Sequence, residues 1–265
     1  MYAFNYQKAK SVADATALLG KNADAKVLSG GQSLIAAMKL RLANPSDIVD
    51  ISAIKDLAGI KVEGNTVTIG AMTRHAQVAA SAEVKKAIPA LAALAGGIGD
   101  RMVRNMGTIG GSVANNDPAA DYPAGLVALG ATVITDKRKI SADEFFKGMY
   151  ETALQAGEII TAVSFQVPKR AAYMKFKNPA SRYAIVGVFV ADFGSSVRVA
   201  VTGAAAGVFR VPEMEKALAA KFTPEAVAGI KVPEDNLNND MHAKADYRSH
   251  LITVMAKRAV EAALK

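Results

Sequence analysis

The sequence predicts an α+β chain in two parts that meet near residues 168–172. Three observations predict this class. Segments with helical spacing and short apolar segments with strand spacing occur throughout the chain, glycine-bearing turns separate them, and 265 residues suffice to bury a substantial core. No internal repeat or low-complexity segment is present.

Residues 1–53 predict a small β-α-β unit. A helix is expected over 11–19, because Ser11 can cap its beginning and Gly20 can end it. The other expected elements of this unit are strands over 26–28 and 47–51 and a helix over 34–42.

The middle of the chain begins with a predicted hairpin. Residues 59–70 alternate on both sides of Gly64-Asn65, a dipeptide typical of tight hairpin turns. Helical spacing follows from Arg74 to about Ala95, with an interruption near Pro89, and glycines punctuate residues 96–121. This part is completed by an expected helix over 122–129 and strands over 131–135 and 158–167.

Residues 168–172 are interpreted as a linker. After it, two strands are expected to pair antiparallel around Gly194-Ser195. The expected elements are strands over 184–190 and 196–201 and helices over 213–220 and 243–264. The last helix is expected to face the core with Leu251, Val254, Met255, Ala259 and the stem of Arg258.

The composition excludes several kinds of site. The chain has no cysteine, so it carries no disulfide, thiolate nucleophile or iron–sulfur cluster of its own. Its three histidines are scattered, which favours ordinary histidines over metal ligands, and no metal site is expected. No apolar run is long enough to span a membrane, and no signal peptide is apparent, so we expect a cytoplasmic protein.

The net charge of +8 permits an acidic partner, but it does not by itself indicate nucleic acid. Lysine and arginine are spread along the chain, and the one short basic stretch, residues 136–139, is better explained as a solvated turn. No nucleic-acid partner is therefore expected.

Two glycine-bearing turns carry the functional signal. They are Ser29-Gly-Gly-Gln-Ser-Leu34 and the segment that begins Thr108-Ile-Gly-Gly-Ser112. Glycine allows close approach of the main chain, and successive amides form an anion-binding nest, so two such turns predict a dinucleotide held from both sides. Neither turn has the Gly-x-Gly-x-x-Gly pattern of a Rossmann site or the lysine of a P-loop. The alternative for each is an ordinary loop.

These turns, in this order, resemble the FAD-binding medium subunit of molybdenum hydroxylases, the family of xanthine dehydrogenase and aerobic carbon monoxide dehydrogenase. The similarity runs essentially from end to end. It includes the segments 29–34, 38–43, 99–112, 117–121, 143–146, 173–176, 183–188 and 246–251.

The resemblance implies a two-lobed FAD-binding domain of the vanillyl-alcohol-oxidase (PCMH) type over 1–170, with lobes of about 1–53 and 54–170. A small α+β domain over 171–265 follows it. FAD is expected to be bound without a covalent link between the two lobes. The residues that the resemblance assigns to the cofactor are Ser29, Gly30, Gly31, Gln32, Ser33, Leu34, Thr108, Ile109, Gly110, Gly111, Ser112, Asp121, Lys175 and Tyr183.

Lys175 matches a family lysine near the pyrimidine end of the flavin, and Tyr183 an aromatic residue near its isoalloxazine ring. Read from the sequence alone, Lys175 is equally well a surface lysine of a strand, and Tyr183 is better explained as an ordinary aromatic residue of a strand. The sequence departs from the family at Ser29, where alanine is common, and at Pro179 and Arg182, which replace an arginine and an aspartate beside the flavin edge.

The implied function is electron transfer, with no general acid or base on this chain. The family's molybdenum cofactor lies on a large partner subunit and its two [2Fe-2S] clusters on a small one, and a dimer of such heterotrimers is expected. The resemblance leaves open the substrate (carbon monoxide, an aldehyde, a purine or another N-heterocycle) and the acceptor (NAD, quinone or oxygen). Two alternatives remain: a free-standing flavin oxidase or reductase of the same fold, and a flavin-free scaffold subunit.

Overall fold

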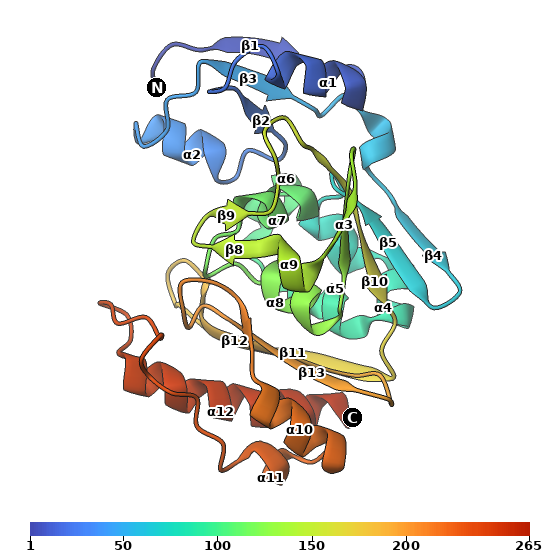
Figure 1. Ribbon diagram of the computed structural model, residues 1–265, viewed down its shortest axis with the longest axis vertical. Coiled ribbons are helices and arrows are strands. Elements are labelled where there is room, and N and C mark those ends of the chain that lie inside the picture. The colour runs from blue at the N-terminus through green and yellow to red at the C-terminus, as the bar shows by residue number, and fades with distance from the viewer.

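The computed structural model describes all 265 residues, arranged in three tiers along the long axis of the molecule (Figure 1). The first tier is a small sheet with two helices, the middle tier a larger sheet with most of the helices, and the last tier a sheet covered by the C-terminal helices. The predicted α+β class is confirmed.

The first tier is a parallel three-stranded sheet in the order β1-β3-β2. The side chain of Ser11 accepts a hydrogen bond from the Asp14 amide, as the cap prediction requires. The β-α-β prediction is confirmed, although the second helix ends at Lys39 rather than Leu42. The elements are β1 (Asn5–Lys8), α1 (Val12–Leu19), β2 (Lys26–Leu28), α2 (Leu34–Lys39) and β3 (Asp47–Asp50).

The middle tier is built on an antiparallel sheet in the order β4-β5-β10-β6-β7. The hairpin predicted around Gly64-Asn65 is present as β4 and β5. The strands are β4 (Ile60–Glu63), β5 (Thr66–Gly70), β6 (Thr132–Thr135), β7 (Lys139–Ser141) and β10 (Ile160–Gln166), with a separate hairpin of β8 (Phe146–Gly148) and β9 (Glu151–Thr152).

The helices of this tier are more numerous than the sequence predicted. The helical stretch expected over 74–95, with its interruption near Pro89, is three short helices, the last of which begins at Pro89, and the punctuated segment 96–121 contains two that were not predicted. Asp100 and Thr108 cap these two by accepting from the amides of Val103 and Gly111. The helices are η1 (Lys55–Leu57, a 3-10 turn), α3 (His75–Ala80), α4 (Ala82–Ala87), α5 (Pro89–Gly96), α6 (Arg101–Met106), α7 (Ile109–Asn115), α8 (Tyr122–Ala128) and α9 (Ala142–Phe145).

The last tier is an antiparallel sheet in the order β11-β12-β13-β14. The linker prediction is wrong from Arg170 onward, because that residue already pairs with Asp192 across the sheet. Arg258 is exposed, so its stem does not face the core as predicted, whereas Leu251 and Met255 do. The elements are β11 (Arg170–Lys177), β12 (Ala184–Asp192), β13 (Val197–Thr202), β14 (Phe209–Arg210), α10 (Pro212–Ala220), α11 (Pro224–Val227) and α12 (Ala245–Ala263).

The sheet of the last tier is covered on both faces. All nine residues of β12 are buried. On one face, Phe189, Ala191 and Ala200 belong to the same apolar cluster as the helices of the middle tier. On the other, Val188 and Val190 pack with residues of α12. None of the helices has the length and apolar character needed to cross a membrane.

Candidate functional site

The first glycine turn joins β2 to α2 and presents a run of free amides. The backbone N–H groups of residues 30–34 donate no hydrogen bond within the chain. Gly31 supports this geometry with a φ of 70°, a left-handed conformation that side chains with a Cβ rarely adopt. Five consecutive free amides can bind an anion such as a diphosphate.

The second glycine turn differs from the expectation of another run of free amides. Thr108 caps α7, and the amides of Ile109, Gly110, Gly111 and Ser112 all donate within the chain. Gly110 is needed for packing, since a Cβ there would lie 2.5 Å from the Cβ of Ala71. This turn can therefore offer its Ser112 hydroxyl, which makes no hydrogen bond within the chain, but no run of amides.

The structure brings the two turns into contact. The hydroxyls of Ser29 and Thr108 lie 2.7 Å apart. Gly30 lies directly against the end of α6, where a Cβ would come within 2.2 Å of the Met106 carbonyl oxygen. The predicted residues 29–34 and 108–112 thus form one continuous wall contributed by two tiers, and Gly30 is the residue that lets the tiers approach.

Asp121 and Lys175 form a buried ion pair at the boundary with the C-terminal tier. Their side chains are 4% and 8% exposed, and the ammonium lies 3.0 Å from Oδ1 of the carboxylate. Tyr173 donates a hydrogen bond of 2.5 Å to the same oxygen. Burial raises the pKa of the Asp121 carboxyl, and the Lys175 and Tyr173 donors oppose that shift.

The Lys175 ammonium uses all three of its donors inside the protein. Besides Asp121, it donates to the carbonyl oxygens of Gly97 at 2.9 Å and of Arg182 at 3.0 Å. It can thus contribute positive charge to a neighbouring group but has no free N–H for it. Arg182 precedes Tyr183 in the chain. The Lys175 ammonium therefore connects Asp121 with the backbone next to Tyr183, so the three predicted positions lie along one set of contacts.

Tyr183 lies away from the glycine turns, on the loop between β11 and β12. The residue is 45% exposed and its hydroxyl has no partner in the chain. It lines a pocket of about 290 Å³ together with Asp117 and Tyr150. Asp121 is close enough to contribute to the raised pKa of Tyr183, whose principal cause is burial. This pocket therefore adjoins the Asp121 cluster.

The loop that carries Asp121 is tied to the C-terminal sheet. The Gly203 amide donates to the carbonyl oxygen of Pro118 at 2.9 Å, and the Ala184 amide donates to that of Ala119 at 3.3 Å. The Thr202 hydroxyl lies 2.6 Å from the carbonyl oxygen of Ala120 and 3.1 Å from that of Pro118. The last tier thus fixes the position of residues 117–121.

A neutral aromatic pair lies beneath the second turn. His75 is 4% exposed, and its ring centroid is 5.4 Å from that of the fully buried Tyr122. Burial, reinforced by Arg104, lowers the pKa of His75 to about 4. His75 Nδ1 and the Tyr122 hydroxyl have no partner within the chain. Gly107 is required here, because a Cβ would lie 2.6 Å from His75 Nε2.

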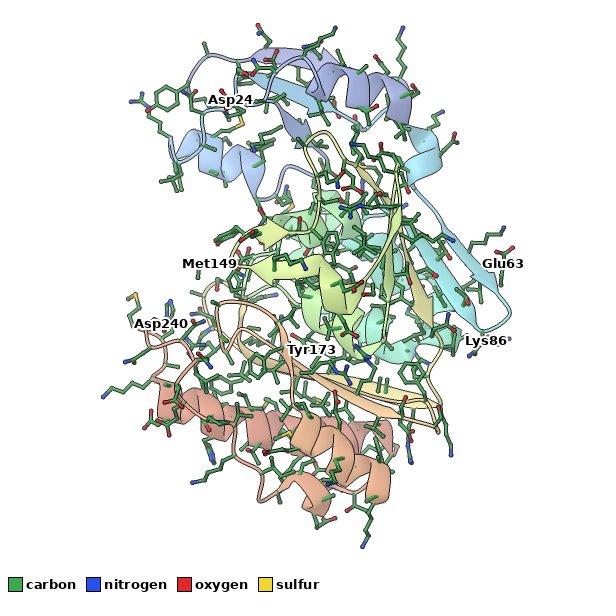
Figure 2. All side chains as sticks on the ribbon, viewed as in Figure 1. Asp24, Glu63, Lys86, Met149, Tyr173 and Asp240 are labelled. Carbon is green, nitrogen blue, oxygen red and sulfur yellow. The ribbon has the colours of Figure 1, made fainter.

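Two residues of these clusters were missed in the sequence. Tyr173 stands two positions before Lys175 on β11, and residues with that spacing share one face of a strand, so its spacing could have identified it. Figure 2 shows Tyr173 between the middle tier and the C-terminal sheet. Tyr150 gives no such signal, because its position depends on the long-range contact between the β8–β9 hairpin and Asn116.

Two family models together cover nearly the whole chain. Residues 2–169 match the FAD binding domain in molybdopterin dehydrogenase, and residues 171–263 match the CO dehydrogenase flavoprotein C-terminal domain.

Similar proteins match along their full length. The carbon monoxide dehydrogenase medium chain of Hydrogenophaga pseudoflava is 39% identical over 98% of this chain and 96% of its own. The nicotine 6-hydroxylase medium subunit of Paenarthrobacter nicotinovorans is 36% identical over 97% and 96%.

Solved structures agree with these matches. A carbon monoxide dehydrogenase structure from Hydrogenophaga pseudoflava aligns with a TM-score of 0.89 at 37% identity, covering 99% of this chain and 98% of that one. Quinoline 2-oxidoreductase from Pseudomonas putida 86 aligns with a TM-score of 0.87 at 27% identity, covering 99% and 97%.

Proposed function

Because this chain belongs to the family of FAD-binding medium subunits of molybdenum hydroxylases, we propose that it passes electrons from [2Fe-2S] clusters on a partner chain to an external acceptor. As a member of this family, the chain is a subunit of an oxidoreductase. The observation that carries the proposal is the run of five free amides in the first glycine turn, held against the second turn by Gly30.

The residues of the two turns fit FAD. The free amides of residues 30–34 would bind its diphosphate, because each N–H can donate to an anionic oxygen without competing with a bond in the chain. We propose that the other predicted residues of the wall, which include Gln32 and Ser112, contact the rest of the dinucleotide. When bound, FAD supplies the redox chemistry by accepting and releasing electrons.

Asp121, Lys175 and Tyr173 are proposed to orient the site rather than to transfer protons. The ammonium and the phenol hold the carboxylate in one position, since both donate to it from β11. The Lys175 cation beside Asp121 would stabilise negative charge on a reduced cofactor bound there. It would do so through space and not by a hydrogen bond, because its three N–H groups are occupied. Asp121 then keeps free lone pairs for a ligand.

The remaining parts of the proposal follow the relatives. A large molybdenum subunit and a small [2Fe-2S] subunit would be the partners, in a dimer of heterotrimers located in the cytoplasm. The chain, which has no cysteine, can provide no thiolate ligand for a cluster, in agreement with clusters on another subunit. We also propose two domains, 1–170 with lobes of about 1–53 and 54–170, and 171–265.

The test is purification of the chain from its native host under mild conditions, followed by an absorption spectrum, metal analysis and a gel. We expect flavin bands together with molybdenum, iron and two further chains. Non-covalent binding is checked by precipitating the protein with acid and finding FAD in the supernatant. A colourless single chain that cannot take up FAD would contradict the proposal.

A further inference from the structure

A cavity with no assigned role lies where the middle tier meets the last tier. Its volume is about 320 Å³, and its lining comes from α8, the α9–β8 segment and the residues that lead into β14. There α8 packs against β13 and β14, and Figure 1 shows α8 next to the sheet of the last tier. None of the lining residues belongs to the glycine turns, to the Asp121 cluster or to the pocket beside Tyr183. The cavity is therefore separate from the proposed FAD site.

The walls of this cavity are mostly apolar. Val127 and Ala142 are buried members of the large core cluster, and Val208 is partly buried against it. Two phenyl rings complete the walls, Phe146 at the start of β8 and Phe209 at the start of β14. Aromatic side chains of this kind provide faces on which a flat ring can stack. The volume is at the lower end of ligand sites, which matches one or two rings rather than a dinucleotide.

Asp143 provides a hydrogen-bond acceptor at the cavity. It is one of only two charged residues in the lining. Its Oδ1 accepts from Nη2 of Arg198 at 2.5 Å, while its Oδ2 accepts no hydrogen bond within the chain. The nearest cation to Oδ2 is Nη1 of Arg210, at 3.8 Å, which is too long for a hydrogen bond. The Asp143 side chain is 43% exposed, so a ligand can reach this oxygen.

Arg210 provides a donor beside that acceptor. Its Nε and Nη2 donate to the two oxygens of Glu215 at 2.8 and 2.7 Å. Glu215 is itself held by the Val199 amide, which donates to it at 2.9 Å, so the guanidinium is fixed in place. The two N–H groups on Nη1 of Arg210 donate to no group of the chain. A fixed donor and a free acceptor therefore stand side by side at the cavity.

The charges around the cavity cancel. Arg198 and Arg210 contribute two positive charges. Their partners Asp143 and Glu215 contribute two negative ones. A charged ligand would disturb this balance, whereas an uncharged one would not. An acceptor next to a donor is complementary to an N–H group next to a carbonyl group, and a lactam ring presents both in one plane.

We propose that this cavity binds a small, uncharged, flat ring with a lactam group, the N–H and carbonyl pair of a free nucleobase such as uracil. Asp143 would accept from the ring N–H, and Arg210 would donate to the ring carbonyl oxygen. The inference goes beyond the proposed electron-transfer function and does not depend on it. Because Asp143 and Arg210 come from the two different matched domains, the ligand would contact both of them.

The test is titration calorimetry of the full chain with three compounds. Uracil is the first, and 1,3-dimethyluracil, which keeps the flat ring and both carbonyl groups but has no N–H, is the second. We expect uracil to bind, and the dimethyl compound to bind roughly tenfold more weakly because Asp143 has nothing to accept. Absence of heat with uracil, or equal Kd values for the two compounds, would overturn the proposal. A short oligouridine is the third compound, and tighter binding of it than of uracil would assign the cavity to RNA and overturn the proposal of a free ring.

Asp143→Ala separates recognition of the ring from a structural role. It should raise the Kd for uracil roughly tenfold, to that of 1,3-dimethyluracil, and leave the Kd of the dimethyl compound unchanged. A purely structural effect would weaken both compounds by the same factor. The chain should still fold, because an ion pair with a half-exposed carboxylate contributes little to stability. Glu63→Ala is the control, since it removes an exposed carboxylate paired with Lys61 on β4 and should change neither Kd.

Failure of this inference is distinguishable from failure of the proposed function. The flavin absorbance of each sample reports FAD content independently of the calorimetry. A chain that carries FAD but gives no heat with uracil refutes the lactam site alone. A chain that binds uracil selectively but never takes up FAD supports the lactam site and contradicts the proposed function. Selectivity that persists in Asp143→Ala would show that uracil binds elsewhere and would overturn the proposal.

Discussion

Gly30→Ala tests whether close approach of the two glycine turns creates the cofactor site. The added Cβ would lie 2.2 Å from the Met106 carbonyl oxygen and 2.7 Å from the Cα of Gly107, whereas ordinary contacts begin at 3.4 Å. Both atoms belong to the backbone and cannot rotate away. One turn must therefore move by about 1 Å relative to the other, and such overpacking costs about 1–3 kcal/mol of folding stability.

The larger effect is expected on FAD. A displaced turn loses at least one of the hydrogen bonds from its free amides to the diphosphate, and each bond to a charged group contributes about 1.5–3 kcal/mol. The Kd for FAD should thus rise roughly 10- to 100-fold. It is measured by the change in flavin fluorescence during titration of the FAD-free chain.

Gly96→Ala provides the control for this experiment. Its Cβ would lie 3.8 Å from that of Ala79, an ordinary contact, and its position as the last residue of α5 favours alanine by at most about 0.5–1 kcal/mol. We expect it to bind FAD as the unaltered chain does. The reasoning is refuted if Gly30→Ala binds FAD with unchanged affinity and melts at an unchanged temperature.

Substitutions that probe three further buried contacts test the surroundings of the site. The pKa of His75 is lowered from 6.5 to about 4 in the folded chain, so the unfolded chain binds the proton first as the pH falls. The free energy of unfolding should therefore fall by up to about 3 kcal/mol between pH 6.5 and pH 4. His75→Gln should flatten this part of the profile of denaturation against pH. Lys175→Met leaves the Asp121 carboxylate buried without its cation and should lower the free energy of unfolding, measured in urea, by about 3–5 kcal/mol. Adding Asp121→Asn should restore most of that stability. A loss below about 1 kcal/mol in Lys175→Met would contradict the buried pair. Thr202→Val should cost about 1–2 kcal/mol by leaving a buried carbonyl oxygen unpaired, and Thr202→Ser, which keeps the hydroxyl, should lose less; equal losses would mean that packing rather than the hydrogen bond matters.

The sequence was most informative where a residue has local conformational preferences. Gly20, Gly64 and Ser11 led to correct helix ends and a correct hairpin, because their effects act within a few residues. The Asp100 and Thr108 caps were equally local, but the glycines between 96 and 121 concealed the two short helices that they begin.

The site itself depends on contacts between residues far apart in the sequence. Nothing near Lys175 shows that its ammonium meets Gly97 and Arg182, and nothing near Ile109 shows that its amide pairs with Thr73. A glycine-rich turn predicts that amides can be presented, while only the tertiary structure decides whether they are free. That is why the amides of the first turn are free, as expected, and those of the second are not.

The division of the apolar core has a consequence for how the molecule opens. The N-terminal tier packs around a cluster of only seven buried residues, three of which (Ile54, Leu57 and Ile159) come from the segments that join it to the middle tier, whereas one cluster of 30 joins the middle tier to β12 and β13 of the last. Small cores confer little resistance to unfolding, so we expect the first 53 residues to be the least protected part of the chain and to exchange their amide hydrogens first. A dinucleotide held by residues 29–34 and 108–112 links this lobe to the larger unit. Bound FAD would therefore hold the N-terminal tier against the middle tier. Its loss would loosen the N-terminal tier before any other part of the protein.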